Sequence, residues 1–134
     1  AALDVARRNG ARLGLEVVWH QGEWWSAVGP LHFDLALANP PYVAPGDPHV
    51  WALRHEPALA LTPRDDAGQG LADIERIALG APPHLERGAW LLLEHGAEQA
   101  QAVRSCLQRL GFAAAKTRAD LAGRARVTGG AYRP

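Results

Sequence analysis

The sequence predicts an α/β fold whose sheet is mostly parallel and finishes in an antiparallel strand pair. Apolar runs of strand length alternate along the chain with segments of helical spacing, which is the pattern of strand-helix-strand units. Several of these runs are apolar at nearly every residue, as parallel strands covered on both faces are. With 134 residues and 48% hydrophobic content, the chain is long enough for one domain with its own core.

The first part of the chain is expected to hold one helix and two strands. Apolar and small side chains recur at helical spacing over residues 1–13 and predict an amphipathic helix. The segment LEVVWH (15–20) is interpreted as a short buried strand, and GEWWSAV, which follows closely, predicts a loop that enters a turn of helix. HFDLALAN (32–39) is apolar at nearly every position after its aspartate and predicts a central parallel strand.

The second part of the chain is expected to begin with a long loop. Residues 40–70 contain six of the ten prolines and show no sustained hydrophobic period, and long loops in compact domains are usually functional or disordered. Helical spacing then returns. The remaining elements are expected in the order helix 71–85, strand 88–96, helix 97–111, strand 112–120 and a last strand within 124–133, which pairs with the strand before it.

Composition and charge argue against several classes of function. Fourteen Lys and Arg residues balance fourteen Asp and Glu residues, so no overall field attracts the chain to nucleic acid or to an anionic membrane. The single cysteine, Cys106, falls in a helical pattern and is expected to be a buried thiol in a reducing compartment. The six histidines lack metal-ligand spacing, and no apolar run approaches the ~18 residues of a membrane span. The expected protein is soluble, cytoplasmic and without a metal.

The sharpest local signal is the tetrapeptide Asn39-Pro40-Pro41-Tyr42, which follows the apolar strand directly. Two consecutive prolines hold φ at about −65° and remove two amide donors, so the strand must stop at Asn39. The carboxyl ends of strands in an open α/β sheet are where ligands bind. A plain proline turn that closes the strand is the alternative interpretation.

This arrangement suits methyl transfer to a planar amide or amino nitrogen. Such a nitrogen shares its lone pair with the neighbouring carbonyl or ring and is a poor nucleophile, so geometry has to activate it. The Asn39 side-chain oxygen and the Pro40 carbonyl would each accept a hydrogen bond from the NH2 group and aim its lone pair at an incoming methyl group. The Tyr42 ring would stack on the flat substrate group.

Two further places carry weaker signals. Glu56 in RHEPALAL is interpreted either as a loop anchor that pairs with Arg54 or a backbone amide, or as a solvated charge. Glu94 and His95 end a strand at the carboxyl edge of the sheet, but no nucleophile lies near them in the sequence. A structural role is therefore favoured for both.

The chain resembles the HemK-type protein-(glutamine) methyltransferases, which modify the glutamine of the Gly-Gly-Gln motif in class 1 peptide chain release factors. NPPY is shared with adenine amino methyltransferases, so by itself it indicates the type of reaction and not the substrate. DPH, HEP, LLLEHG and RVT together are more specific to the glutamine enzymes. These motifs follow the family's order and spacing, within VARRNGARLGL (5–15), GEWW (22–25), FDLALANPPYV (33–43), DPHV with HEPALAL (47–61), GAWLLLEHG (88–96) and RVTGGAY (126–132).

The resemblance implies a Rossmann-like class I methyltransferase fold that uses S-adenosyl-L-methionine as its cofactor. It also implies that Asn39, Pro40, Pro41 and Tyr42 hold the substrate glutamine amide. Asn39 would be the catalytic residue and would border the cofactor as well. The implied protein partner is a class 1 release factor, with no membrane partner and no direct contact with nucleic acid.

The resemblance gives a second cofactor residue, Trp24, which matches the position that lies against the adenine ring. An indole face over a purine is a common use of a half-buried tryptophan. The alternative interpretation is a core tryptophan beside Trp25. The family usually has Asp where this chain has Glu23, so a hydrogen bond from that carboxylate to adenine is not carried over.

Two parts of the family pattern have no counterpart in the sequence. In the family pattern, a Gly-rich cofactor loop follows the first strand and an acidic residue stands at the end of the second strand. In this chain GQG at 68–70 follows a loop and not a strand. The chain, residues 1–134, is therefore interpreted as a partial catalytic domain that lacks the first two strands, the Gly-rich loop and the helical amino-terminal domain. It is expected to be inactive alone.

Alternatives to release-factor methylation stay open at this point. An adenine amino methyltransferase of nucleic acid would share NPPY, although a zero net charge does not favour a nucleic-acid groove. A ribosomal protein glutamine methyltransferase would share the same chemistry. A non-catalytic α/β binding module would keep the strand and loop as an interaction site.

Overall fold

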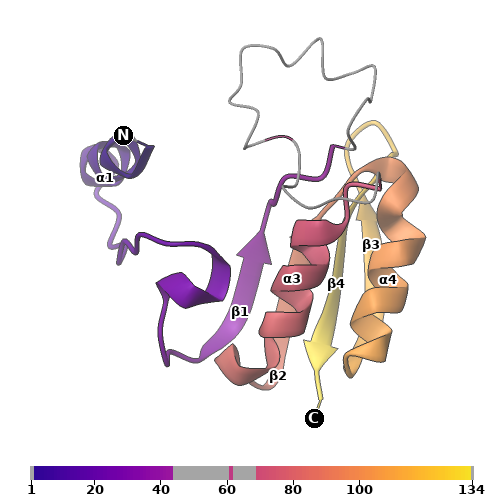
Figure 1. Cartoon of the computed structure of the whole chain (residues 1–134). Coiled ribbons are helices and arrows are strands. Elements are labelled where there is room, and N and C mark those ends of the chain that lie inside the picture. The colour runs from indigo at the N-terminus through magenta and orange to yellow at the C-terminus, as the bar shows by residue number, and fades with distance from the viewer. Residues whose placement is uncertain (1, 44–60, 62–68, 134) are drawn as a thin grey trace. The chain divides into compact units, whose positions relative to one another are not determined.

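The computed structural model describes residues 2–43, 61 and 69–133. The chain divides into two compact units, Ala1–Leu31 and His32–Pro134. The first contains helix α1 and a short 3-10 helix, and the second contains the sheet with its helices (Figure 1). The expected alternation of helices and strands is confirmed in the second unit.

The first unit confirms the expected helix and corrects the expected strand. Helix α1 spans Ala2–Arg12 and the 3-10 helix η1 spans Trp24–Ala27. Residues 15–20, predicted to be a buried strand, form no strand and are exposed except for the half-buried Trp19. The described residues offer them no partner strand, and an unpaired strand is not stable by itself in water. The Trp19 ring instead packs against Gly10 of α1, where a Cβ would lie 2.9 Å from it.

The second unit is built on a mixed sheet. Its described strands are β1 (Phe33–Ala38), β2 (Leu85–Glu94), β3 (Phe112–Ala119) and β4 (Ala125–Tyr132), in the spatial order β1-β2-β4-β3. β1 is parallel to β2, and β4 is antiparallel to both β2 and β3. The antiparallel pair at the carboxyl end is therefore confirmed, and β4 lies between β2 and β3 rather than outside them.

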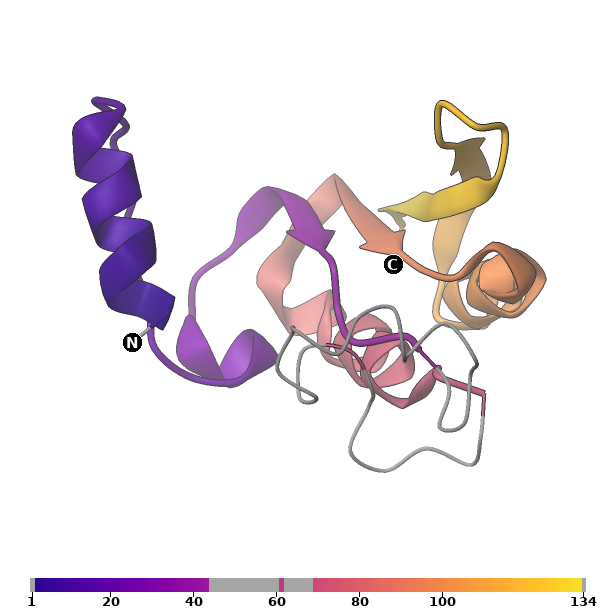
Figure 2. The ribbon, with the colours of Figure 1, turned by 90° about the horizontal axis from the view of Figure 1, so that it is seen from above.

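Two helices cover one face of this sheet. Helix α3 spans Ala72–Gly80, and α4 spans Ala100–Arg109 after the 3-10 turn η4, Ala97–Gln99; a further 3-10 turn, η3, spans Pro82–His84. Figure 2 shows both α-helices on the same side of the strands. The core lies between these layers and includes Ile74, Ile77, Leu91, Leu93, Val103 and Leu107.

Strand β1 differs from its predicted environment. It was expected to be covered on both faces, but Leu35 is 51% exposed and Leu37 is 69% exposed. Side chains alternate between the two faces of a strand, so these leucines point away from the face that carries α3 and α4. Trp90, which pairs with Leu35 in β2, is also 37% exposed. Within the described part of the second unit, no helix covers that face.

Cys106 is buried in α4, as predicted, and its burial raises the pKa of the thiol. Among the described helices, none has the length and apolar character needed to cross a membrane.

Candidate functional site

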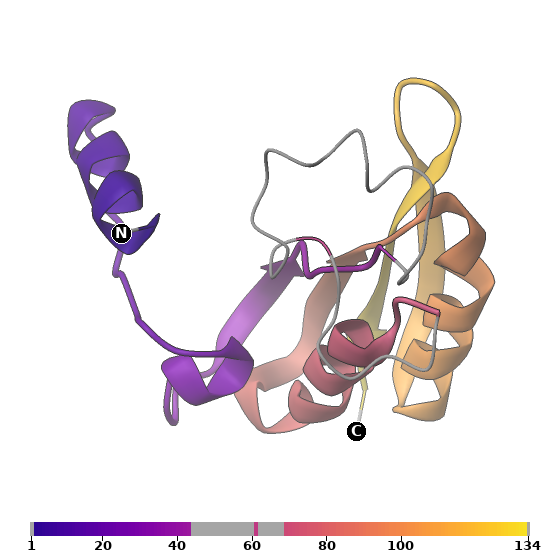
Figure 3. The same cartoon turned by 45° about the horizontal axis from the view of Figure 1, so that its top comes forward.

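The Asn39–Tyr42 segment leaves β1 at its carboxyl end. β1 ends at Ala38, immediately before Asn39, as the two prolines require. The segment then runs across the carboxyl end of β2 (Figure 3). Pro40 is fully buried and anchors the segment, while Asn39 is exposed. Within the described residues, the Asn39 side chain makes no hydrogen bond, so its amide is available to a ligand.

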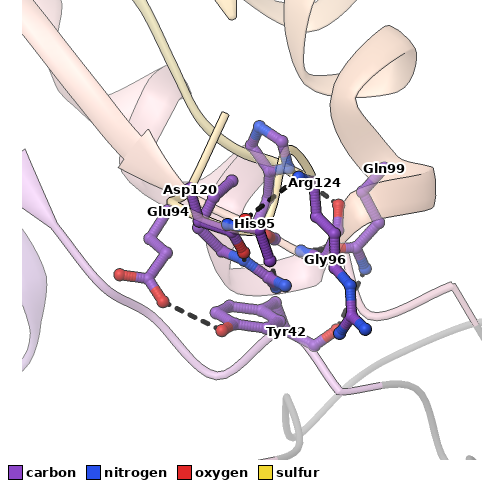
Figure 4. A network of polar contacts seen from close by, with 9 residues as sticks. Tyr42, Glu94, His95, Gly96, Gln99, Asp120 and Arg124 are labelled. Carbon is purple, nitrogen blue, oxygen red and sulfur yellow. Dashed lines mark hydrogen bonds and ion pairs between the residues drawn. The ribbon is translucent and has the colours of Figure 1, made fainter. Parts of the chain in front are cut away.

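Tyr42 is held by the end of the neighbouring strand. Its hydroxyl donates a hydrogen bond to Glu94 Oε1 at 2.9 Å (Figure 4). Burial raises the pKa of the Tyr42 hydroxyl, and the hydrogen bond to Glu94 adds to this rise. The phenol therefore stays protonated and acts as a donor at neutral pH. Sequence reasoning missed this role of Glu94, because the two residues are 52 positions apart in the chain.

The main chain around Tyr42 is held as well. The Tyr42 carbonyl accepts a hydrogen bond from Gln99 Nε2 at 3.0 Å. The next amide, Val43 N–H, donates to the Leu61 carbonyl at 2.9 Å. The backbone that leaves the NPPY segment is thus fixed by two separate hydrogen bonds.

The turn between β3 and β4 lies at the same edge of the sheet. Asp120 Oδ1 accepts hydrogen bonds from the amides of Ala122 and Arg124 at 2.9 and 3.0 Å. Backbone hydrogen bonding, led by the Arg124 amide, lowers the pKa of Asp120. Its other oxygen lies 3.5 Å from Arg126 Nε, and Arg126 also donates to the His95 carbonyl at 3.3 Å. These contacts join the β3–β4 turn to the end of β2.

His95 belongs to a buried chain of hydrogen bonds behind the site. Its Nδ1 lies 2.8 Å from the Gly96 carbonyl, and its Nε2 lies 2.7 Å from Thr128 Oγ1. Thr128 is in turn 2.8 Å from Thr117 Oγ1, which accepts from Arg104 at 3.0 Å. Since the guanidinium only donates and the carbonyl only accepts, one neutral tautomer, protonated on Nδ1, satisfies every member.

The environment of His95 supports the structural role that the sequence favoured. Its side chain is fully buried, and burial lowers the pKa of its imidazole. The buried imidazole uses both ring nitrogens in hydrogen bonds, one of them to Thr128, and so connects the end of β2 to β4. The adjacent Glu94 differs, because its carboxylate contacts the NPPY segment.

Replacing Thr128 by valine is expected to lower the free energy of unfolding by about 1–3 kcal/mol. Valine has nearly the same shape, but it leaves His95 Nε2 without a donor and Thr117 without its buried partner. Urea unfolding of the chain measures the change. Thr117→Val, at the partly exposed end of the same chain of bonds, should cost less. Equal stability of wild type and Thr128→Val would contradict the proposed bonding.

The remaining predicted residues lie in the first unit or outside the described residues. Trp24 begins η1 in the first unit and is half-buried, so its contact with an adenine ring stays a prediction. Glu56 and Arg54 lie outside the described residues, as do His49 and His55. Over the described ranges, no group of three or more His, Cys, Asp or Glu side chains is placed to hold a metal ion.

Comparison with known proteins gives a consistent set of relatives. A release factor glutamine methyltransferase of Xylella fastidiosa (strain Temecula1) is 47% identical over 133 residues, which are 97% of this chain and 47% of the relative. The enzyme of the same name from Neisseria gonorrhoeae is 44% identical over 135 residues, 98% of this chain and 48% of the relative. The chain thus spans about half the length of the curated relatives it matches.

No protein family model matches the sequence. Among solved structures, a protein-(glutamine-N5) methyltransferase (release factor-specific) from Alicyclobacillus acidocaldarius is similar, with 30% identity and a TM-score of 0.41 over 56% of this chain and 47% of that one.

Proposed function

We propose that this chain belongs to the release factor glutamine methyltransferase family, as its similarity to the relatives suggests, and that it takes part in methylating the side-chain amide nitrogen of a protein glutamine. The observation that carries the proposal is the exposed Asn39 amide at the carboxyl end of β1, on a segment anchored by the buried Pro40. The sequence match over nearly the whole chain supports it.

In this mechanism the residues of the chain activate the nitrogen by position alone. The glutamine NH2 group donates one hydrogen bond to Asn39 Oδ1 and one to the Pro40 carbonyl, so its lone pair points away from both acceptors. The prolines keep these acceptors rigid and offer no competing donors. The Tyr42 ring, held at its hydroxyl by Glu94, lies against the flat amide. Held in this way, the nitrogen would accept the methyl group that a bound donor supplies and would then lose its surplus proton to solvent.

The methyl donor in this proposal is S-adenosyl-L-methionine, whose sulfonium supplies an electrophilic methyl group when bound. The described residues fit it in two respects. The exposed Asn39 amide can hydrogen-bond to a polar group at the strand end, and Trp24 offers a half-buried indole suited to a purine. Asn39 and Trp24 are accordingly proposed as cofactor-binding residues.

The proposed substrate is the Gly-Gly-Gln glutamine of a class 1 release factor, and the proposed location is the cytoplasm, where such factors act. The names of the relatives support this choice. The balanced charge of the chain also favours a protein substrate over nucleic acid. Residues 1–134 would then be part of a catalytic domain whose other part supplies the remaining cofactor contacts.

A chimaera tests the proposal. The chain replaces the 133 matched residues of the Xylella fastidiosa relative, and the product is assayed with methyl-labelled cofactor and a purified class 1 release factor. We expect label in the release factor and none in a release factor whose Gly-Gly-Gln glutamine is replaced by alanine. A folded chimaera that labels neither would contradict the proposal. In a parallel assay with DNA as the acceptor, labelling of adenine would favour the nucleic-acid alternative.

Replacing Trp24 by alanine is expected to weaken binding of S-adenosylhomocysteine to the chimaera by about 1–3 kcal/mol, through lost stacking and burial. Calorimetric titration measures the dissociation constant. Trp90→Ala serves as the control, because Trp90 is an exposed tryptophan of β2 outside the proposed cofactor contact. An unchanged dissociation constant in Trp24→Ala would leave Trp24 with a structural role only.

A further inference from the structure

The side-chain amide of Gln99 joins three stretches of backbone beside the NPPY segment. Its Oε1 accepts a hydrogen bond from the Gly96 amide at 2.7 Å. Its Nε2 donates to the Tyr42 carbonyl at 3.0 Å and to the Gln69 carbonyl at 2.6 Å. Figure 4 shows Gln99, Gly96 and Tyr42 together at the end of β2.

These bonds use the Gln99 amide fully. An NH2 group has two hydrogens, and each meets a carbonyl; the oxygen meets a backbone N–H. The reversed orientation would place NH2 against an N–H and oxygen against two carbonyls, so the amide can sit only one way. A carboxylate of the same shape would keep the bond from Gly96 but would repel the carbonyls of Tyr42 and Gln69.

Gly70 shows how closely the backbone stretches approach each other. A Cβ on Gly70 would lie 2.2 Å from the Tyr42 carbonyl oxygen and 2.7 Å from Gln99 Nε2. Gly70 also has φ +68°, a value that other residues rarely adopt. The Gln69–Gly70 backbone therefore packs directly on Tyr42, and the Gln99 amide bonds to both.

Gln99 is itself held by a rigid element. It is the last residue of η4 and leads into α4, whose buried face consists of Val103, Cys106 and Leu107. Through Gln99 the main chain of Tyr42 is tied to the core, as its hydroxyl is tied to β2 through Glu94.

We propose that Gln99 is a positioning residue for the methyl transfer. By holding the Tyr42 carbonyl, it sets the peptide planes of the NPPY segment and with them the Pro40 carbonyl that accepts from the substrate amide. The effect of Gln99 on the rate rests on the proposed function, whereas the effect of Gln99 on the backbone does not. A misplacement of about 1 Å in such a segment can cost roughly 100-fold in rate.

The kinetic test compares two substitutions of the same chemical kind in the chimaera. Gln99→Glu is expected to lower kcat by roughly 10- to 100-fold while the KM for S-adenosylmethionine changes less than about twofold. Gln101→Glu, on exposed α4 surface two residues further, should leave both unchanged. Gln99→Met, a neutral side chain of similar length, should also lower kcat, which shows that the added charge is not the cause.

A second measurement on the 134-residue chain separates this inference from the proposed function. In Gln99→Glu we expect amide hydrogen exchange to accelerate at least about tenfold at Val43, next to the released carbonyl, and to stay slow at Gly96, whose acceptor is kept. Unchanged kcat in an active chimaera, or unchanged exchange at Val43 in the chain, would overturn the inference. A folded but inactive wild-type chimaera with the expected exchange pattern would refute the proposed function, and with it the role of Gln99 in the reaction, but would leave the hold of Gln99 on the Tyr42 backbone in place.

Discussion

Asn39→Ala is expected to lower the turnover of the chimaera by roughly two or more orders of magnitude, while the free energy of unfolding changes by no more than about 1–2 kcal/mol. Asn39 is exposed and its side chain makes no hydrogen bond within the described residues, so folding gains little from that side chain. The reaction loses the acceptor that holds the substrate nitrogen, and this contact has its full value only when the nitrogen is aligned with the methyl group.

Methyl transfer to a release factor and urea unfolding, measured on the same preparation, give the two quantities. Asp34→Ala is the matched control, because Asp34 is an exposed polar residue near the opposite end of β1. It should leave turnover unchanged. Turnover of Asn39→Ala near that of wild type would remove Asn39 from the proposed catalytic role.

Gly70→Ala is expected to destabilise the chain by about 3 kcal/mol or more, because it combines backbone strain with a steric clash. The added Cβ would lie 2.2 Å from the Tyr42 carbonyl oxygen and 2.8 Å from its carbon. That carbonyl belongs to backbone held by Gln99, so it cannot move away as a flexible side chain would. Thermal or urea unfolding of the 134-residue chain measures the loss.

Gly123→Ala isolates the contribution of strain. Gly123 has φ +78°, similar to that of Gly70, but an added Cβ would meet nothing within 4 Å. It should therefore cost only about 1 kcal/mol. If the two substitutions lower the free energy of unfolding by the same amount, Gly70 does not approach Tyr42 as closely as described.

Features that depend on neighbouring residues could be predicted from the sequence. Helical spacing over 1–13 and 97–111 corresponds to α1 and to η4 with α4, because one face of a helix is specified by its own residues. The end of β1 before Asn39 follows from the prolines, whose missing amide donors are a local property. The NPPY segment could therefore be placed at a strand's carboxyl end without any structure.

Features that depend on pairing between distant residues were decided only by the tertiary structure. An apolar run such as 15–20 has strand character, but a strand forms only where a partner exists to satisfy its backbone. The position of β4 between β2 and β3 depends on the hydrogen-bonding edges that those strands leave open. Tyr42 is hydrogen-bonded to Glu94, 52 positions away in the sequence, and to Gln99, 57 positions away. No local pattern encodes such contacts, because they form only when the sheet brings the ends of its strands to one edge.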